Sequence, residues 1–219
     1  AAYVRLCRDS VQVRSAATIA GYFRYKAELI HQSPPLIRFY DVISQSEIDH
    51  MTDEAWTKLT PSALHQNQRT SNRTHLLRVS QTAWLPDNTV TIRRLSARVG
   101  QITGLDTSQL PLDTPAEPFQ IVNYGLGGLY VPHEDSVRRA REMGQENSPS
   151  LSGSGDRIAT WMFYLSDSEA GGATVFPRLN LYVRPIKGSA ILWYNLKRNG
   201  DVDKKLVHAS CPVLIGNKW

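Results

Sequence analysis

His133 and Asp135 are the residues with the clearest capacity for chemistry, and they lie two positions apart in the stretch LYVPHEDS. In an extended chain successive side chains alternate between two faces, so His133 and Asp135 point the same way and Glu134 points oppositely. One imidazole and one carboxylate on a shared face can chelate a metal ion. Such a pair is common by chance, so a metal site requires a further ligand elsewhere in the chain.

Five other histidines are available as that ligand. His31 and His50 lie in helical or connecting segments and His65 lies in a polar loop, so we expect all three at the surface. His75 lies near a strand-like segment and is a weaker rival. His208 differs because the stretch KKLVHASCPVLIGNKW places it in a late strand, which favours it as the third ligand.

Two histidines and one carboxylate with open coordination positions form the facial triad of non-haem Fe(II) oxygenases. The ligands alone do not name the metal, because Zn²⁺ binds such donors more tightly than Fe²⁺. A separate cation for a keto-acid co-substrate would favour iron, since the distal carboxylate of 2-oxoglutarate is costly to bury unpaired. Lys218 is the candidate cation, and a solvated lysine near the chain end is the alternative. A zinc hydrolase fits worst, because no residue is recognisable as its general base.

The elements that position these residues fall into two parts, of which the first hundred residues are mainly helical. Ser44 and Glu47 form a capping box before an apolar stripe at helical spacing. Asp87 can cap a second helix, and Gly104 follows its stripe where a left-handed residue would end it. These helices are expected to cover a sheet.

From Phe119 onward, short β-like runs alternate with Gly and Pro, which favours a sandwich or barrel. The Ser/Gly-rich stretch from Gln145 to Asp156 predicts a mobile loop that follows the His-x-Asp pair. The expected strands are 76–84, 119–124, 158–165, 173–176, 181–184, 189–194, 205–209 and 213–218.

The composition excludes few function classes. The chain has 219 residues, of which 41% are hydrophobic and 21% charged, as in globular domains. It has no apolar run long enough for a membrane span, and its net charge of +5 is not gathered in a Lys/Arg block, so we expect no nucleic-acid partner. Cys7 and Cys211 can pair only if the fold brings the two ends of the chain together.

Several long blocks of sequence resemble the catalytic domain of collagen prolyl 4-hydroxylase α subunits. They are FQIVNYGLGGLYVPHEDS, DRIATWMFYLSDSEAGGATVFP, KGSAILWYNL and HASCPVLIGNKW, with LIRFYDVIS and RVSQTAWL upstream. The resemblance extends from about Leu36 to Trp219 and implies a mostly β fold, a double-stranded β-helix (jelly-roll) core with supporting N-terminal α-helices. We expect an N-terminal helical extension (1–35) and a dioxygenase domain (36–219), with helical support (36–110), jelly-roll core (111–219) and mobile loop (144–156).

The resemblance also implies site residues and cofactors. The cofactors would be Fe(II), 2-oxoglutarate and ascorbate. The iron ligands would be His133, Asp135 and His208; the residues binding 2-oxoglutarate would be Lys218, Thr174 and Tyr124; and those facing the peptide would be Tyr130, Arg157, Arg78 and Trp84. Each has an ordinary alternative: Thr174 as a strand former, Tyr124 and Trp84 as core aromatics, and Arg157 paired at the surface with Asp156 or Asp167.

The sequence departs from the family in places. Glu134 and Ser136 replace aromatic residues of the usual His-Phe-Asp-Phe pattern, and no catalytic role is expected for Glu134. Phe23 stands where the family has the partner of the cysteine matching Cys7, so Cys7 is expected to be a free thiol. Family members continue beyond Lys-Trp into a segment with a further Trp, His and Cys, and an enzyme that lacked this segment would have doubtful peptide binding.

The function implied by the resemblance is 4-hydroxylation of proline in collagen-like X-Pro-Gly peptides, with release of succinate and CO₂. One alternative is a prolyl hydroxylase that acts on other proline-rich proteins. Another is a non-catalytic module that binds proline-rich peptides. The family also implies the endoplasmic reticulum lumen and protein disulfide isomerase as a partner subunit.

Overall fold

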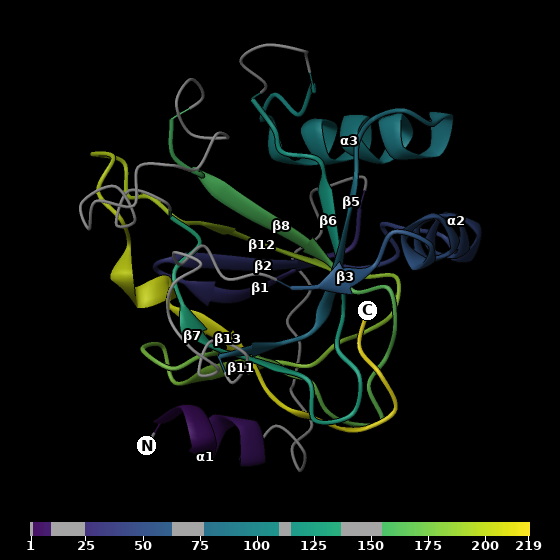
Figure 1. The fold of residues 1–219 in the computed structure, drawn as a ribbon. Coiled ribbons are helices and arrows are strands. Elements are labelled where there is room, and N and C mark those ends of the chain that lie inside the picture. Colours follow the sequence, from purple (N-terminus) through teal and green to yellow (C-terminus); the bar gives the residue numbers. More distant parts are fainter. Residues whose placement is uncertain (1, 10–24, 63–76, 110–114, 137–154) are drawn as a thin grey trace, which may run out of the picture.

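Two β-sheets face each other at the centre of the computed structural model, which describes residues 2–9, 25–62, 77–109, 115–136 and 155–219 (Figure 1). All paired strands in both sheets are antiparallel. The four-stranded sheet has the order β1 (Ala27–Gln32), β2 (Pro35–Phe39), β12 (Ala190–Tyr194) and β8 (Ala159–Phe163). The five-stranded sheet has the order β11 (Leu181–Val183), β10 (Thr174–Phe176), β13 (His208–Ser210), β7 (Leu129–His133) and β4 (Arg78–Val79).

The interior between these sheets is filled by apolar side chains from both. Leu36 of β2 and Trp193 of β12 meet Phe176 of β10 and Val183 of β11, and all four are nearly or completely buried. Full burial of side chains of this size stabilises a fold by about 1.5–3 kcal/mol each. This arrangement confirms the predicted mostly β, jelly-roll core.

Two small sheets extend this core. One contains β3 (Thr60–Pro61), β5 (Gln81–Leu85) and β6 (Phe119–Asn123), and the other contains β14 (Val213–Ile215) and β9 (Ala170–Gly171). The single strand expected over 76–84 is therefore divided, because β4 pairs with β7 whereas β5 pairs with β6. The change of partner interrupts the alternation of faces that the sequence suggests.

Helices α2 (Gln45–Trp56) and α3 (Val90–Thr103) pack with β5 and β6 around a shared apolar cluster. The capping box between Ser44 and Glu47 is present, and Gly104 ends α3 with a φ of 71°. The expected cap at Asp87 is wrong: the Thr89 hydroxyl accepts the first-turn N–H, whereas the Asp87 carboxylate accepts a hydrogen bond from Ser96. Thr89 directly precedes the first helical residue, the position that lets a short side chain reach the N–H three residues on.

Helix α1 (Ala2–Asp9) covers the outer face of the five-stranded sheet, where Leu6 packs against Val175 and Ala209 (Figure 1). This contact brings the two cysteines together as the disulfide Cys7–Cys211, with a Cα–Cα distance of 5.3 Å. The expectation of a free thiol at Cys7 is therefore wrong. The physical reason is tertiary, because the two thiols are 204 residues apart in the chain.

Other expectations for the termini and loops also need correction. Residues 27–32, expected in a helical extension, form β1 and pair with β2. The expected strand over 205–209 begins at His208, after the 3-10 helix η3 (Lys204–Leu206). Most of the expected loop 144–156, together with His65 and His75, lies outside the described residues. No helix in the described ranges is long and apolar enough to cross a membrane.

Candidate active site

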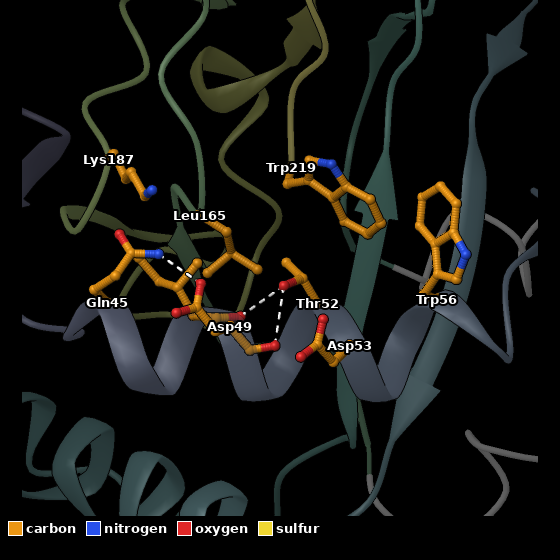
Figure 2. A pocket seen from close by; sticks show the side chains of 9 residues that line it. Gln45, Asp49, Thr52, Asp53, Trp56, Leu165, Lys187 and Trp219 are labelled. Carbon is orange, nitrogen blue, oxygen red and sulfur yellow. Dashed lines mark hydrogen bonds between the residues drawn. The ribbon is translucent and has the colours of Figure 1, made fainter.

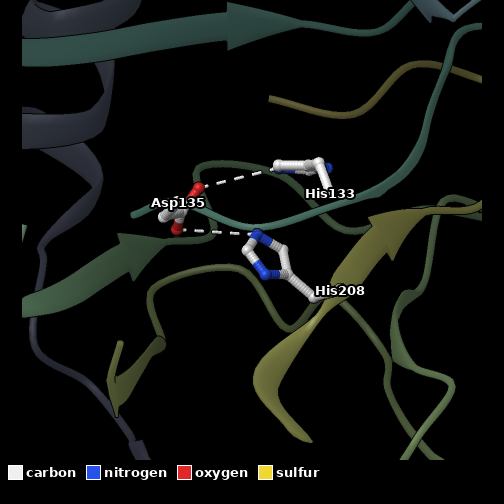
Figure 3. Close-up of side chains that lie close together, drawn as sticks. All are labelled: His133, Asp135 and His208. Carbon is white, nitrogen blue, oxygen red and sulfur yellow. Dashed lines mark ion pairs between the residues drawn. The ribbon is translucent and has the colours of Figure 1, made fainter. Parts of the chain in front are cut away.

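His133, Asp135 and His208 come together inside the jelly roll (Figure 3). Strands β7 and β13 pair antiparallel with His133 opposite His208, and Asp135 follows the end of β7 by two residues. One Asp135 oxygen, Oδ1, lies 3.6 Å from His133 Nε2, and the other, Oδ2, lies 3.6 Å from His208 Nε2. One donor atom from each residue lies within 4.8 Å of the other two, which is close enough to share one metal ion.

Both imidazoles are oriented by backbone carbonyls. His133 Nδ1 lies 2.9 Å from the Val131 oxygen, and His208 Nδ1 lies 3.0 Å from the Leu206 oxygen. A carbonyl oxygen only accepts hydrogen bonds, so each Nδ1 carries the proton and each Nε2 presents its lone pair to the site. This is the usual outer arrangement of metal-binding histidines, so the three side chains fit a divalent metal ion.

Burial sets the protonation of the ligands. Burial, followed by the charge of His208, lowers the pKa of His133 to about 3. For Asp135, burial alone raises the pKa, but the charges of His208 and His133 and the hydrogen bond from Thr160 together lower it. At neutral pH the site therefore holds a neutral His133 imidazole and an ionised Asp135 carboxylate, the states that bind metals.

Aromatic rings pack on both histidines. The Tyr130 ring stacks on His133 with centroids 3.6 Å apart, and the Arg78 guanidinium lies 4.8 Å from the centre of the Tyr130 ring. On the other side, the Trp193 ring packs edge-on against His208 with centroids 4.8 Å apart. Arg78 and Tyr130, predicted to face the peptide, thus form a layer directly over one predicted metal ligand.

Lys218 is buried, with 5% of its surface exposed, and its ammonium group points into the same interior. The ammonium donates hydrogen bonds to Ser210 Oγ at 2.9 Å and to Thr174 Oγ1 at 3.4 Å. In the described part of the chain, no carboxylate forms an ion pair with it. Burial lowers the pKa of Lys218 to about 7. A buried cation with hydroxyl neighbours but no counter-ion is suited to bind an anionic ligand.

The backbone places Lys218 beside the triad. Lys218 and Tyr124 form an isolated β-bridge with hydrogen bonds of 2.8 and 2.9 Å, and the Tyr124 ring lies 5.4 Å from the ammonium. Ser210 follows His208 by two residues on β13, so both side chains face the interior, roughly 7 Å apart along the strand. The predicted metal ligands and the predicted carboxylate anchor therefore face the same interior.

Arg157 and Trp84, both predicted to face the peptide, lie in different surroundings. Arg157 makes a two-bond ion pair with Glu117 rather than with either acid considered from the sequence, and its Nη1 lies 3.3 Å from the Asp135 carbonyl oxygen. Trp84 lies on β5 with 43% of its surface exposed, and it makes no ring contact with the triad in the ranges described. Arg157 thus reaches the site, whereas Trp84 lies at the surface.

Several site residues escape the sequence interpretation. Ser210 and Tyr164 contact Lys218, Thr160 contacts Asp135, and Glu117 holds Arg157. A hydroxyl residue inside an otherwise apolar strand is the sequence feature that could have identified Ser210 and Thr160. Glu117 has no comparable signal, because its role depends on a partner 40 residues away.

The structure also contains a cavity of about 310 Å³ beside α2 (Figure 2). It is bordered by one face of α2 and by Leu165 and Trp219, and the Trp56 and Trp219 rings lie 6.0 Å apart at its edge. Because Lys218 points to the triad and Trp219 points to this cavity, the two sites are separate.

The comparisons agree with this geometry. Residues 119–219 match the model of the 2OG-Fe(II) oxygenase superfamily. The chain is 43% identical to prolyl 4-hydroxylase subunit alpha-1 of Rattus norvegicus over 187 residues, covering 85% of this chain and 33% of that protein. It is 39% identical to subunit alpha-2 of Caenorhabditis elegans, covering 89% of this chain and 34% of that protein. The chain thus spans about a third of the length of the curated relatives it matches.

A solved structure supports the fold. The viral collagen prolyl hydroxylase of Paramecium bursaria Chlorella virus-1 superposes with a TM-score of 0.60 at 21% identity, covering 84% of this chain and 90% of that chain. The jelly roll, the His-Asp-His cluster and the sequence matches point to one assignment. Residues 119–219 form a domain of the 2OG-Fe(II) oxygenase superfamily, and over 85% of its length the chain is similar to prolyl 4-hydroxylase alpha subunits.

Proposed function

We propose that this chain hydroxylates peptidyl proline at C4, in collagen-like X-Pro-Gly sequences, with Fe(II), O₂ and 2-oxoglutarate as reactants. The observation that carries the proposal is the buried ammonium of Lys218, which has no counter-ion among the described residues and lies in the interior that also holds His133, Asp135 and His208. A dicarboxylate co-substrate requires such a cation, because its distal carboxylate is costly to bury unpaired. The names of the relatives support proline as the residue that is modified.

The donor set fits Fe(II). Two imidazole nitrogens and one carboxylate supply three donors and leave coordination positions open for co-substrates. When bound, the metal and 2-oxoglutarate supply the oxidative chemistry, in which O₂ is consumed and the keto acid becomes succinate and CO₂. The protein contributes orientation and a water-poor interior. His133, Asp135 and His208 would hold the metal, each already in the required protonation state or orientation.

Lys218 would anchor the distal carboxylate of 2-oxoglutarate. Its protonated form pairs with a carboxylate, and Thr174, which already accepts a hydrogen bond from the Tyr164 hydroxyl at 3.0 Å, adds a polar contact beside it. Tyr124 lines the same place, and burial raises its pKa to about 12, so its hydroxyl stays protonated as a donor. The anchor would orient the keto-acid end toward the metal ligands.

The peptide would lie over the layer of Tyr130 and Arg78. Tyr130 is stacked between the guanidinium and His133, so a proline on this layer would be near the metal. Arg157 and Trp84 complete the predicted peptide-facing set, with Arg157 held beside the Asp135 backbone. Substitution of Tyr130 should therefore change the KM for peptide more than that for 2-oxoglutarate.

We also infer an oxidising compartment, the endoplasmic reticulum lumen, with protein disulfide isomerase as a partner subunit. The Cys7–Cys211 disulfide supports the compartment, because such bonds persist where thiols are not kept reduced. The partner rests on the family resemblance alone. Co-purification of the two proteins from secretory-pathway extracts, compared with cytosolic expression, would test both.

The test of the function is direct turnover. The protein would be incubated with Fe(II), ascorbate, 2-oxoglutarate and a panel of peptides: Pro-Pro-Gly repeats, proline-rich peptides without glycine, and repeats with alanine in place of proline. We expect 4-hydroxyproline and an equal amount of succinate with the first, and neither product with the last. Hydroxylation of the glycine-free peptides alone would assign the chain to other proline-rich substrates.

The His208→Ala variant is the matched control. It removes a metal ligand while leaving Lys218 and the peptide layer in place, so it should bind peptide without producing succinate. Peptide binding by the wild-type protein that needs no metal and yields no succinate would contradict the enzyme and favour a binding module.

A further inference from the structure

We propose that Trp193, Asn195 and Thr160 form a hydrogen-bond relay that orients the carboxylate of Asp135 for metal binding. They are positioning residues, because they act through Asp135. The inference rests on the proposed function, since it assigns a task to residues around the same metal site. Neither the family match nor the names of the relatives assigns these three a role.

The relay is continuous, and Trp193 and Asn195 are buried while Thr160 is partly buried. Trp193 Nε1 donates to Asn195 Oδ1 at 2.8 Å, Asn195 Nδ2 donates to Thr160 Oγ1 at 2.9 Å, and Thr160 Oγ1 donates to Asp135 Oδ2 at 2.7 Å. Trp193 is fully buried and Asn195 is 4% exposed. Hydrogen bonds in such surroundings are stronger than in water and reinforce one another along a chain.

The direction of the relay is fixed by its first member. An indole N–H can only donate, so it requires the oxygen of the Asn195 amide and turns the NH₂ group toward Thr160. That NH₂ occupies an acceptor position of the Thr160 hydroxyl, whose own proton is left to point at the Asp135 carboxylate. The carboxylate, which is ionised, can only accept. No member of the relay can reverse its hydrogen-bonding direction and keep all three hydrogen bonds.

The backbone holds the relay in register. Thr160 of β8 lies directly opposite Trp193 of β12, and Asn195 follows Trp193 by two residues, so all three face the same interior. The Asn195 backbone is held on both sides, by bonds to Ile158 at 2.9 Å and to Asp203 at 2.8 Å. The four-stranded sheet therefore supplies a rigid base for a ligand that lies just beyond the end of β7.

Trp193 also connects two of the metal ligands. Its ring packs edge-on against His208, while its N–H begins the relay to Asp135. The Thr160 bond occupies one lone pair of Oδ2 and resists rotation of the carboxylate. A freely rotating carboxylate can turn both oxygens to the metal and cover a position that the co-substrates need. The relay would thus protect both affinity and open coordination.

Metal binding by the full chain tests the relay without turnover. Co(II) affinity would be measured by equilibrium dialysis, and the coordination by the visible absorption of bound Co(II). Thr160→Val keeps the shape of the side chain and removes its hydroxyl, and we expect a 10–100-fold loss of affinity with an altered absorption band. Thr160→Ser retains the hydroxyl and should stay within about threefold of wild type, which separates the hydrogen bond from packing.

Trp193→Phe has a matched control within the same strand pair. It keeps an aromatic ring beside His208 but removes the indole N–H together with part of the ring, and because the Thr160 hydroxyl remains we expect a smaller loss than for Thr160→Val, about three- to tenfold. Trp161→Phe removes an indole N–H that is also buried and has no hydrogen-bond partner among the described residues, and it should leave affinity unchanged.

The outcomes separate the two proposals. If the wild type binds no Co(II), or if the His208→Ala variant binds Co(II) as tightly as the wild type, the proposed metal site is refuted. If the wild type binds one Co(II) and His208→Ala abolishes binding, but Thr160→Val and Trp193→Phe bind with wild-type affinity and spectrum, the metal site stands and the relay is refuted.

Discussion

Replacing Lys218 by methionine should stabilise the ligand-free protein while removing its affinity for 2-oxoglutarate. Methionine has a similar length and no charge, so it fills the space of the lysine chain without a buried ammonium. The opposite signs of the two effects distinguish a residue kept for binding from one kept for stability.

The magnitude follows from the pKa of Lys218, which burial lowers from 10.5 to about 7. A difference of one in pKa corresponds to about 1.4 kcal/mol, so the buried ammonium costs the folded state about 5 kcal/mol at acidic pH and about 4 kcal/mol at pH 7. The hydrogen bonds to Ser210 and Thr174 return about 1 kcal/mol each. Lys218→Met should therefore raise the free energy of unfolding by about 2 kcal/mol at pH 7.

The gain should depend on pH. Below about pH 7 both the folded and the unfolded wild type carry the proton on Lys218, and the cost of burying the charge is complete. Between about pH 7 and 10.5 the folded state loses that proton first, so the cost shrinks as pH rises. The advantage of the variant should thus be largest at pH 6 and absent near pH 10.

Urea unfolding of the metal-free proteins, followed by tryptophan fluorescence between pH 6 and 10, measures the gain. Calorimetric titration of Co(II)-loaded protein with 2-oxoglutarate measures the lost affinity, which we expect to exceed tenfold. Lys197→Met, at an exposed lysine, is the control and should change stability by less than about 0.5 kcal/mol. A Lys218→Met protein less stable than wild type at pH 6, or a difference that does not vary with pH, would refute the reasoning.

Three further perturbations have expected outcomes. Reducing Cys7–Cys211, or Cys7→Ser, should lower the free energy of unfolding by about 2–5 kcal/mol, because the bond closes a very long loop; equal urea midpoints with and without reductant would contradict this. Gly171→Ala should lower the free energy of unfolding by more than about 3 kcal/mol, because its Cβ would lie 2.1 Å from a backbone oxygen. Gly216→Ala, at a similar φ but in open space, should lower it by only about 1–2 kcal/mol. Similar melting temperatures for the two variants would exclude the clash. The hydrogen-bonded guanidinium of Arg98 lowers the pKa of Glu47 from 4.5 to about 2. Glu47 should therefore add about 1 kcal/mol to the free energy of unfolding, discounted for solvent screening, above pH 4.5, and this stabilisation should be lost toward pH 2. An unchanged acid-unfolding curve for Glu47→Gln would argue against it.

The local elements follow largely from the sequence. The capping box at Ser44 and the left-handed residue at Gly104 mark helix boundaries correctly, because caps depend on residues a few positions apart. The error at Asp87 is of two residues, since Asp87 and Thr89 are both acceptable caps and the hydrogen bond to Ser96 decides between them. The strands expected in the second half are located within one to three residues, because Gly and Pro mark their ends, whereas β7 and β9 are not among the expected strands.

Elements whose partners are distant could not be predicted in the same way. Cys7 meets Cys211 only because α1 packs on the outer face of the five-stranded sheet. The run around Arg78 divides between two sheets because its neighbours change from β7 to β6. The pairing of distant strands is set by burial across the whole core. The alternation of apolar and polar residues along one segment does not specify which strand that segment pairs with.

The sequence by itself determined the candidate chemistry: the types and spacing of His133 and Asp135, a third histidine, and a lysine at a fixed distance from it. The tertiary structure decided what surrounds them. Strand register placed His208 opposite His133, and the closure of two sheets buried Lys218 beside hydroxyl groups, with no carboxylate paired to it in the described ranges. Register and closure also brought Thr160 onto Asp135 and Asn195 onto Thr160, because these hydrogen bonds join residues that are neighbours in space and distant in the sequence.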